Sequence, residues 1–130
     1  PYLDAGKVVP FSGTAEILPG LTGTVHPGHT PGSAFYTLTS KGEKITFVGD
    51  IIHAGAVQFP QPGVTITYDE DQNKAASVRE QAFADFVKNR DLIAAPHLPF
   101  PGIGYVTKGE NGGYAWVPVT YTNRDASSVK

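Results

Sequence analysis

The hydrophobic and polar positions of this chain form short apolar runs separated by Gly and Pro, a pattern that predicts strands joined by tight turns. The first two runs flank Pro19-Gly20. The third alternates apolar and polar residues, as a half-buried strand does, and leads through a turn at Lys41-Gly42 into the fourth. The four predicted strands cover residues 15–18, 21–25, 34–39 and 44–48.

Residues 72–89 have the period of a helix, and they are the one segment of the chain that shows it clearly. Apolar residues recur there at spacings of three and four: Val78, Ala82, Phe83, Phe86 and Val87. The charged residues fall mostly on the other side: Arg79, Glu80, Asp85 and Lys88. Asp69 or Asp71 is the expected N-cap. The pattern therefore predicts an amphipathic helix with Arg79 turned away from its apolar face.

The rest of the chain predicts further short strands and no boundary between domains. Over residues 55–67 we expect a loop across the surface or the site, because Pro60 and Pro62 interrupt any strand there. Three more strands are predicted, the last two as a hairpin: 92–95, 103–106 and 114–119. The polar residues 123–130 are expected to form a flexible tail.

Composition narrows the classes of function. The chain has 130 residues, 40% of them hydrophobic, enough for one modest core. A net charge of -2 gives no electrostatic reason to expect nucleic acid or an anionic membrane surface, and no apolar run is long enough to span a membrane. Without Cys there is neither a disulfide nor a thiolate site, which fits a periplasmic or secreted location slightly better than the cytoplasm. The chain starts at Pro1 and has no Met, so we expect sequence upstream.

Three residues with metal-binding chemistry follow predicted strands. His29 stands between two Pro/Gly pairs, while Asp50 and His97 each close an apolar run. Open sheets gather ligands at the carboxyl ends of their strands, so we expect these three side chains to converge. Two imidazoles and a carboxylate form a ligand set for zinc, and for iron or manganese in a related geometry. Asp50 has two oxygens and could bridge two ions in a hydrolytic site, where a bridging hydroxide would be the nucleophile.

Each of these residues alone also has a purely structural interpretation. A His in a Pro/Gly turn is more often structural than a ligand, and turns commonly contain Asp. The three similar strand-end positions taken together favour a metal site. The other histidines are less clear: His26 is expected to be a structural or outer-shell residue. His53 would point toward the metals only if Ile51 and Ile52 turn into the core.

The same segments resemble the later metal-binding motifs of the metallo-β-lactamase superfamily: His29-Thr30-Pro31-Gly32, Phe47-Val48-Gly49-Asp50 and Pro96-His97. Further stretches resemble the C-terminal half of methyl parathion hydrolase and its relatives, including residues 10–13, 56–59, 81–85, 94–104 and 117–121. The resemblance covers residues 1–122. It implies an α/β (α+β) fold, the C-terminal half of an αββα sandwich, mostly β with one clear helix at 72–89.

The resemblance also implies a ligand set. His29 would bind one metal, His97 the other, and Asp50 would bridge them as the catalytic centre of a binuclear site. The ions would be two divalent metals, zinc first, with iron, manganese or cobalt as alternatives. The superfamily's first motif, His-x-His-x-Asp-His, does not occur in this chain. His53 stands where the parathion hydrolase has an apolar pocket residue, so together with His26 it is a candidate for the substrate pocket or outer shell.

These features lead to an expected function. By resemblance the chain is part of a metal-dependent hydrolase that cleaves an ester, lactone or phosphotriester through a metal-bound hydroxide. One His and a shared carboxylate per ion are too few ligands, so we expect the chain to be inactive alone. Its partner would be the N-terminal half carrying the first motif, which would cover an otherwise exposed apolar face; a homodimer is an alternative. The alternatives in function are an acyl-homoserine lactonase-like or β-lactam-hydrolysing activity, or a non-catalytic fragment acting as an assembly surface.

Overall fold

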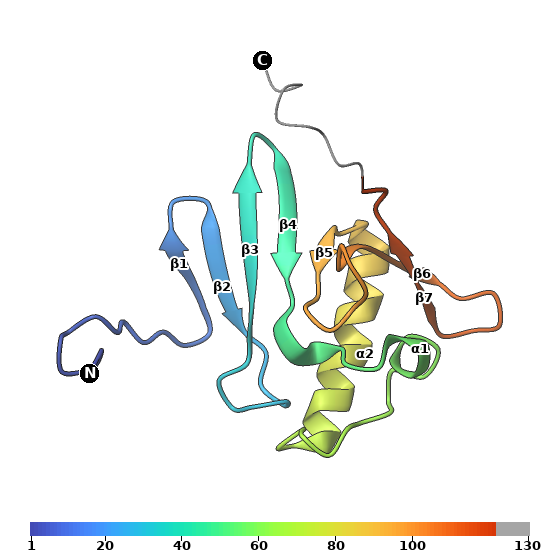
Figure 1. Ribbon diagram of the computed structural model, residues 1–130, viewed down its shortest axis with the longest axis horizontal. Helices are drawn as coiled ribbons and strands as arrows, with labels where there is room; N and C mark the ends of the chain where they lie inside the picture. Colours follow the sequence, from blue (N-terminus) through green and yellow to red (C-terminus); the bar gives the residue numbers. More distant parts are fainter. Residues whose placement is uncertain (122–130) are drawn as a thin grey trace.

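The described part of the chain forms one sheet of seven strands, ordered β1 to β7 as in the sequence (Figure 1). The computed structural model describes residues 1–121, and the predicted tail at 123–130 lies outside the described residues. The strands are β1 (Thr14–Leu18), β2 (Leu21–Val25), β3 (Ala34–Ser40), β4 (Glu43–Phe47), β5 (Ile93–Ala94), β6 (Ile103–Lys108) and β7 (Tyr114–Pro118). The helices are the short 3-10 segment η1 (Gly49–Ile51), α1 (Gly55–Gln58) and α2 (Gln72–Asn89). The predicted mixed α+β class is confirmed.

Strands β1 to β4 pair with their sequence neighbours in antiparallel fashion. The hairpin between β3 and β4 turns at Lys41 and Gly42, whose φ angles are 53° and 83°. Positive φ at both central residues is what a type I′ hairpin turn requires. The predicted turns and the strands beside them are therefore confirmed, with ends that differ by one or two residues.

The chain then crosses over through α2 and returns as β5, which pairs parallel to β4 with Thr46 opposite Ile93 and Phe47 opposite Ala94. Because β2 and β4 are both antiparallel to β3, strands β2, β4 and β5 run in the same direction. The segments that follow these three strands therefore meet at the same end of the sheet, beyond the carboxyl ends of the strands. Strand β5 is shorter than predicted, two residues in place of four.

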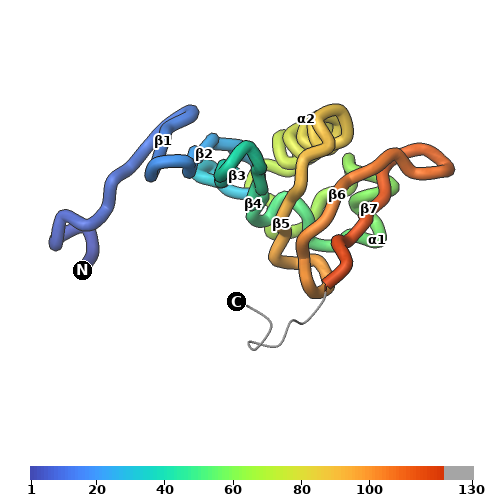
Figure 2. The backbone as a smooth tube through the Cα atoms, turned by 90° about the horizontal axis from the view of Figure 1, so that it is seen from above, coloured from blue at the N-terminus to red at the C-terminus, as the bar shows by residue number. Residues whose placement is uncertain are grey.

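Helix α2 has the predicted bounds and packs on one face of the sheet (Figure 2). Asp71, one of the two predicted N-caps, accepts a hydrogen bond from the Lys74 N–H at 3.0 Å. The helix is joined to the sheet by the main hydrophobic cluster, which contains Phe35, Ala82, Phe83, Phe86, Ile93 and Val106. Burial of these side chains against the strands removes apolar area from water, which stabilises the packing of α2 on the sheet.

One sequence-based expectation about the helical part is wrong, and another holds only in part. Arg79 was expected on the solvent side of α2, but its side chain is fully buried. Its guanidinium donates hydrogen bonds to backbone carbonyls, which offsets the cost of burying the charge. The segment 55–67 contains no strand, as expected, but it begins with the one-turn helix α1 and buries Gln58 and Phe59 rather than running over the surface throughout.

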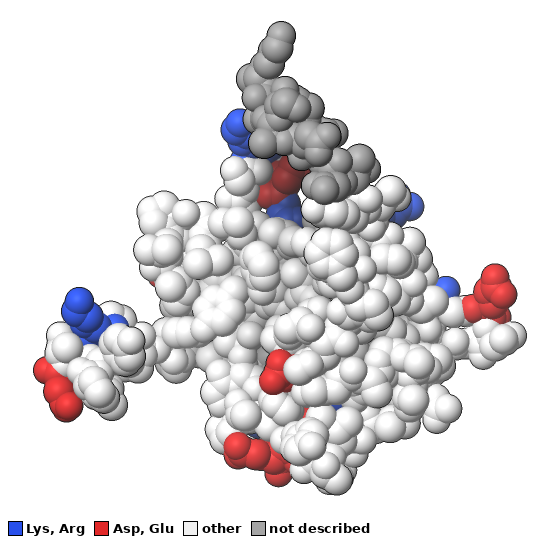
Figure 3. Space-filling model, viewed as in Figure 1, with Lys and Arg blue, Asp and Glu red and all other residues white. Residues whose placement is uncertain are grey.

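Within residues 1–121, no helix packs on the other face of the sheet as α2 does on the first (Figure 2). Alternation along the strands directs apolar side chains to this face, and Tyr36, Leu38, Phe47, Tyr105 and Val117 are each more than a third exposed. Figure 3 shows this face from the front, with few charged side chains over its centre. We call this set of five residues the open face. No helix within residues 1–121 has the length and apolar character that a membrane crossing requires.

Candidate metal centre

The loop between β2 and β3 holds His29 against the start of α2. Its backbone is closed by hydrogen bonds from the His26 N–H to the Ser33 carbonyl and from the Gly28 N–H to the Thr30 carbonyl. Gly28 and His29 in turn accept hydrogen bonds from the N–H groups of residues 71 and 70. A Cβ on Gly28 would lie 2.6 Å from the Ala75 nitrogen, so only glycine allows this close approach. The loop is thus fixed on both sides of His29.

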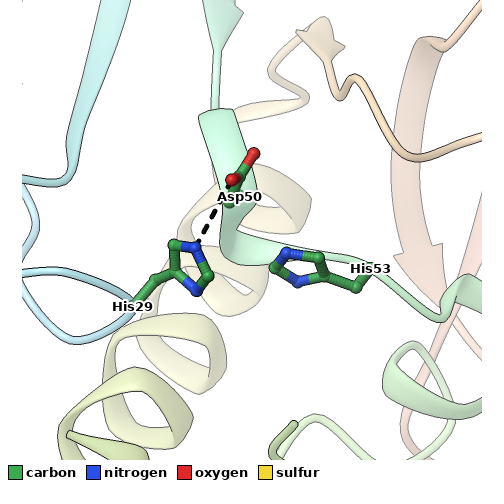
Figure 4. A group of neighbouring side chains, drawn as sticks. All are labelled: His29, Asp50 and His53. Atoms are coloured by element: carbon green, nitrogen blue, oxygen red, sulfur yellow. Dashed lines mark ion pairs between the residues drawn. The ribbon is translucent and has the colours of Figure 1, made fainter. Parts of the chain in front are cut away.

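The His29 ring is oriented by a buried carboxylate. Its Nδ1 lies 3.0 Å from Oδ1 of Asp69, whose side chain is completely buried. Its Nε2 faces the other way and lies 3.4 Å from Oδ2 of Asp50 (Figure 4). Because an ionised carboxylate only accepts, Nδ1 is the nitrogen placed to donate to Asp69, and in a neutral ring Nε2 would then have its lone pair free for an ion held between it and Asp50.

Asp50 lies between two histidines. It belongs to η1, directly after β4, and its Oδ1 is 3.2 Å from Nε2 of His97, which follows β5. The three residues singled out as ligands are therefore brought together from three separate segments. The side chains of Asp50 and His97 are both 44% exposed, whereas that of His29 is 17% exposed. The cluster is open on the His97 side and enclosed on the His29 side.

These distances fit metal ligation. Two donor atoms bound to one tetrahedral ion at about 2.0–2.1 Å lie about 3.3 Å apart. The separations of 3.4 Å on the His29 side and 3.2 Å on the His97 side match this value, and each involves a different oxygen of Asp50. The donor set of two imidazoles and one carboxylate is one that zinc, iron and manganese accept.

His53 lies inside the cluster rather than at its margin. Its ring centroid is 4.9 Å from that of His29 and 4.5 Å from that of His97, with which it stacks. His29, Asp50 and His53 each offer one ligand atom within 4.8 Å of the others. From the sequence, His53 was expected to point toward the metals only if Ile51 and Ile52 turn into the core. Both of these side chains are buried.

The environment of His53 favours a neutral imidazole. Burial lowers its pKa, the nearby His97 and His29 lower it further, and Asp50 and Asp69 oppose the shift. The backbone N–H of His53 donates to Oε1 of the buried Gln58 at 2.8 Å. Its Nδ1 is buried and has no hydrogen-bond partner among the described residues. The ring is therefore held in the site with a polar atom available to a ligand.

His26 is separate from this cluster. Its ring stacks on Phe35, with centroids 3.9 Å apart and planes at 24°. Burial lowers the pKa of His26, and the charge of Asp85 opposes the shift. These contacts place it between the sheet and α2, where it lines one cavity together with His29 and Asp50, and its part in substrate binding stays a prediction.

Sequence reasoning missed Asp69 and Arg79 as parts of the site. Asp69 was considered only as a helix N-cap, and it is 40 residues away from the His29 that it contacts. Arg79 Nη2 lies 3.5 Å from Asp69 Oδ2, and burial lowers the pKa of Arg79 while Asp69 raises it. The one signal in the sequence was the charged Arg79 beside the apolar positions of the helix. The helical period predicts that such a residue faces solvent, so the signal pointed away from the site.

The comparisons with known proteins agree with this geometry. Residues 1–111 match the metallo-beta-lactamase superfamily, and the chain belongs to that family. The metallo-β-lactamase fold expected from the sequence is confirmed. No curated protein matches the chain.

Several solved structures are similar to it. Hydrolase AbOPH of the beta lactamase superfamily is 41% identical with a TM-score of 0.86, covering 95% of this chain and 42% of that chain. AidC, a dizinc quorum-quenching lactonase, is 27% identical with a TM-score of 0.84, covering 92% and 40%. A probable metal-dependent hydrolase from Staphylococcus aureus shares the fold, with 19% identity, a TM-score of 0.63 and coverage of 90% and 42%. The chain thus spans about two fifths of the length of the proteins it matches.

Proposed function

We propose that this chain is the C-terminal half of a metal-dependent hydrolase that cleaves an ester, lactone or phosphotriester. The observation that carries the proposal is the position of Asp50, with one oxygen toward His29 Nε2 and the other toward His97 Nε2 at 3.4 and 3.2 Å. A carboxylate placed in this way is suited to bridging two divalent ions. The family of the chain and the dizinc site named for AidC support the same interpretation.

The residues of this chain would hold the metals and bring the substrate to them. His29 would bind one ion and His97 the other, with zinc as the first candidate and iron, manganese or cobalt as alternatives. When bound, such a metal pair polarises the oxygen of a substrate and lowers the pKa of a coordinated water. The half-exposed Asp50 and His97 leave the site accessible, and His53 adds a ring whose buried Nδ1 has no hydrogen-bond partner among the described residues.

A second polypeptide segment would complete the site. The chain offers each ion one histidine and a shared carboxylate, with His53 as a further donor, whereas a catalytic zinc site normally has three protein ligands. We therefore propose an N-terminal half with the motif His-x-His-x-Asp-His that packs on the open face. The five apolar side chains of that face support this arrangement, because such a surface is stabilised by a second layer. A homodimer through the same face is the alternative.

The proposed substrate class rests on His53 and on the resemblance. The resemblance to methyl parathion hydrolase and its relatives supports esters and phosphotriesters. His53 brings a polar ring to a position that is apolar in the parathion hydrolase, which favours lactones and other esters over an aromatic phosphotriester. We therefore place ester and lactone hydrolysis first. An acyl-homoserine lactone and a β-lactam belong in the same substrate panel.

Metal analysis and the Asp50→Asn substitution test the proposal in the complete protein that contains this chain. We expect two divalent ions per polypeptide and a loss of hydrolysis of more than about 100-fold in Asp50→Asn, because removing a bridging ligand costs more than removing an outer-shell partner. Asp85→Asn is the matched control, since this helix carboxylate bonds only to Gln81 among the described residues and lies outside the cluster. Its activity should equal that of the natural protein.

Two results would contradict the proposal. One is a folded Asp50→Asn protein that keeps its activity, which would show that Asp50 holds no catalytic metal. The other is a complete protein that binds no divalent ion and hydrolyses none of the substrates in the panel. That second outcome would support the alternative of a non-catalytic assembly surface.

A further inference from the structure

Two buried charges lie directly behind His29 and are not ligands in the proposed site. Asp69 precedes α2 and Arg79 lies within it, and both side chains are buried from solvent. Oδ2 of Asp69 accepts a hydrogen bond from the Ile66 N–H at 3.1 Å and lies 3.5 Å from Arg79 Nη2. Oδ1 is left for the His29 ring at 3.0 Å. Both oxygens of the carboxylate are thus engaged, and its orientation is fixed from two sides.

Arg79 joins two further segments to this carboxylate through three backbone carbonyls. Its Nε donates to the carbonyl of Ile51 at 2.6 Å, and its Nη1 donates to the carbonyls of Pro62 and Val64 at 2.8 Å each. Ile51 is the residue after Asp50. The same guanidinium therefore contacts the backbone beside the proposed bridging carboxylate and, through Asp69, the ring of His29.

We infer that Asp69 and Arg79 are positioning residues that fix His29 in its Nδ1–H form, with Nε2 directed at the metal site. This inference rests on the proposed function, because it takes Nε2 of His29 to be the atom that binds a metal ion. An isolated surface histidine exchanges its proton between both nitrogens and rotates freely. A carboxylate behind the ring removes both freedoms and makes the imidazole a better ligand. A planar guanidinium suits the task, since it can donate to a carboxylate and to several carbonyls at once.

A purely structural role is the competing interpretation. A buried ion pair that loses one partner destabilises a protein wherever it lies. The chain offers a matched control for that effect: Asp91 is also buried, and its Oδ1 lies 2.5 Å from Lys44 Nζ, away from the histidine cluster. Asp91→Asn should therefore lower stability without changing His29, whereas Asp69→Asn should change both.

The experiment uses the complete protein with natural residues, with Asp69→Asn and with Asp91→Asn. Nitrogen chemical shifts in the metal-free protein, measured where the histidines are neutral, report which nitrogen of His29 carries its proton. We expect Nδ1–H in the natural protein and a mixture of the two forms in Asp69→Asn. Zinc affinity, measured by competition with a chromophoric chelator, should fall about 10–100-fold for one ion in Asp69→Asn and stay unchanged in Asp91→Asn.

Several outcomes would overturn the inference. The first is an Nε2–H form of His29 in the natural metal-free protein, which needs no variant and applies even if Asp69→Asn fails to fold. The second is an unchanged proton position and zinc affinity in folded Asp69→Asn. The third is an equal loss of zinc affinity in Asp91→Asn. Failure of the proposed function looks different, because the natural protein would then bind no metal while the proton position of His29 could still be measured.

Discussion

The two faces of the sheet differ although the same strands supply both. Strand β3 directs Phe35 to the helix side, where its ring lies 6.0 Å from that of Phe86, and directs Tyr36 and Leu38 to the open face. The helix side is a closed core, whereas apolar side chains on the open face are more than a third exposed. Alternating strands that face water on one side usually carry polar residues there. The open face therefore has the apolar composition of a protein interior, but no second layer within residues 1–121 buries it.

The largest effect is expected on the closed side. Phe83 is fully buried, stacks on Phe59 and meets Tyr114 edge to face. Phe83→Ala should lower the free energy of unfolding by about 3–5 kcal/mol, because it leaves a cavity beside the rings of Phe59 and Tyr114. Urea unfolding of the complete protein measures this change. A loss below about 1 kcal/mol would mean that the helix side is not the main core.

A smaller effect, and a sharper test of the comparison, is expected at Phe47 on the open face. Its side chain is 44% exposed in this chain. If a second layer covers that face in the complete protein, Phe47→Ala should cost about 2 kcal/mol of unfolding free energy, because a buried ring is lost. Urea unfolding of the complete protein gives the value.

The control for Phe47 is Val9→Ala, since Val9 is 89% exposed and precedes the first strand. A surface substitution of this kind should change stability by less than about 0.5 kcal/mol. If Phe47→Ala costs no more than Val9→Ala in the complete protein, nothing covers the open face, and the proposed packing of the N-terminal half on this face is excluded.

The smallest effect concerns pH and His26 on the helix side. Burial lowers the pKa of His26 below 6.5 in the folded protein, so the unfolded chain binds its proton more readily. The stability due to neutral His26 is fully present above the unfolded pKa and decreases as the pH falls toward the folded pKa. Urea midpoints measured at about pH 8 and about pH 5 should therefore differ less in His26→Gln than in the natural protein.

The pKa of His53 is lowered as well, but both proteins contain His53, so it does not affect the difference between them. An equal pH dependence in the two proteins would show that His26 is not buried between the sheet and α2 as described.

Much of the fold could be predicted from local pattern. The bounds of α2 agree with the predicted 72–89, because a long amphipathic period and an Asp N-cap act within the segment itself. The hairpins agree for the same reason, since their turns are set by adjacent residues such as Lys41-Gly42. The shortening of β5 could not be predicted, because its length depends on pairing with β4 and β6, which are distant in sequence.

The ligands of the candidate site could be predicted from the sequence, but the buried residues that hold them in place could not. His29, Asp50 and His97 each follow a strand, and strand direction alone brings them to one edge. The burial of Arg79 depends on carbonyls of Ile51, Pro62 and Val64, whose directions no side-chain pattern encodes. Gln58 was missed for the same reason, since its side chain is buried by bonds to the backbone at residues 53, 54 and 64.

The parallel pairing of β4 with β5 also bears on the order in which the molecule folds. Hairpins among β1 to β4 close over a few residues and form in about 1–10 μs, whereas contacts distant in sequence must first overcome the entropy of closing a long loop. Asp50 and His97 are 47 residues apart, and α2 must dock before they can meet. We therefore expect the bridging geometry to appear in the last step of folding, so that tight metal binding reports that the chain has finished folding.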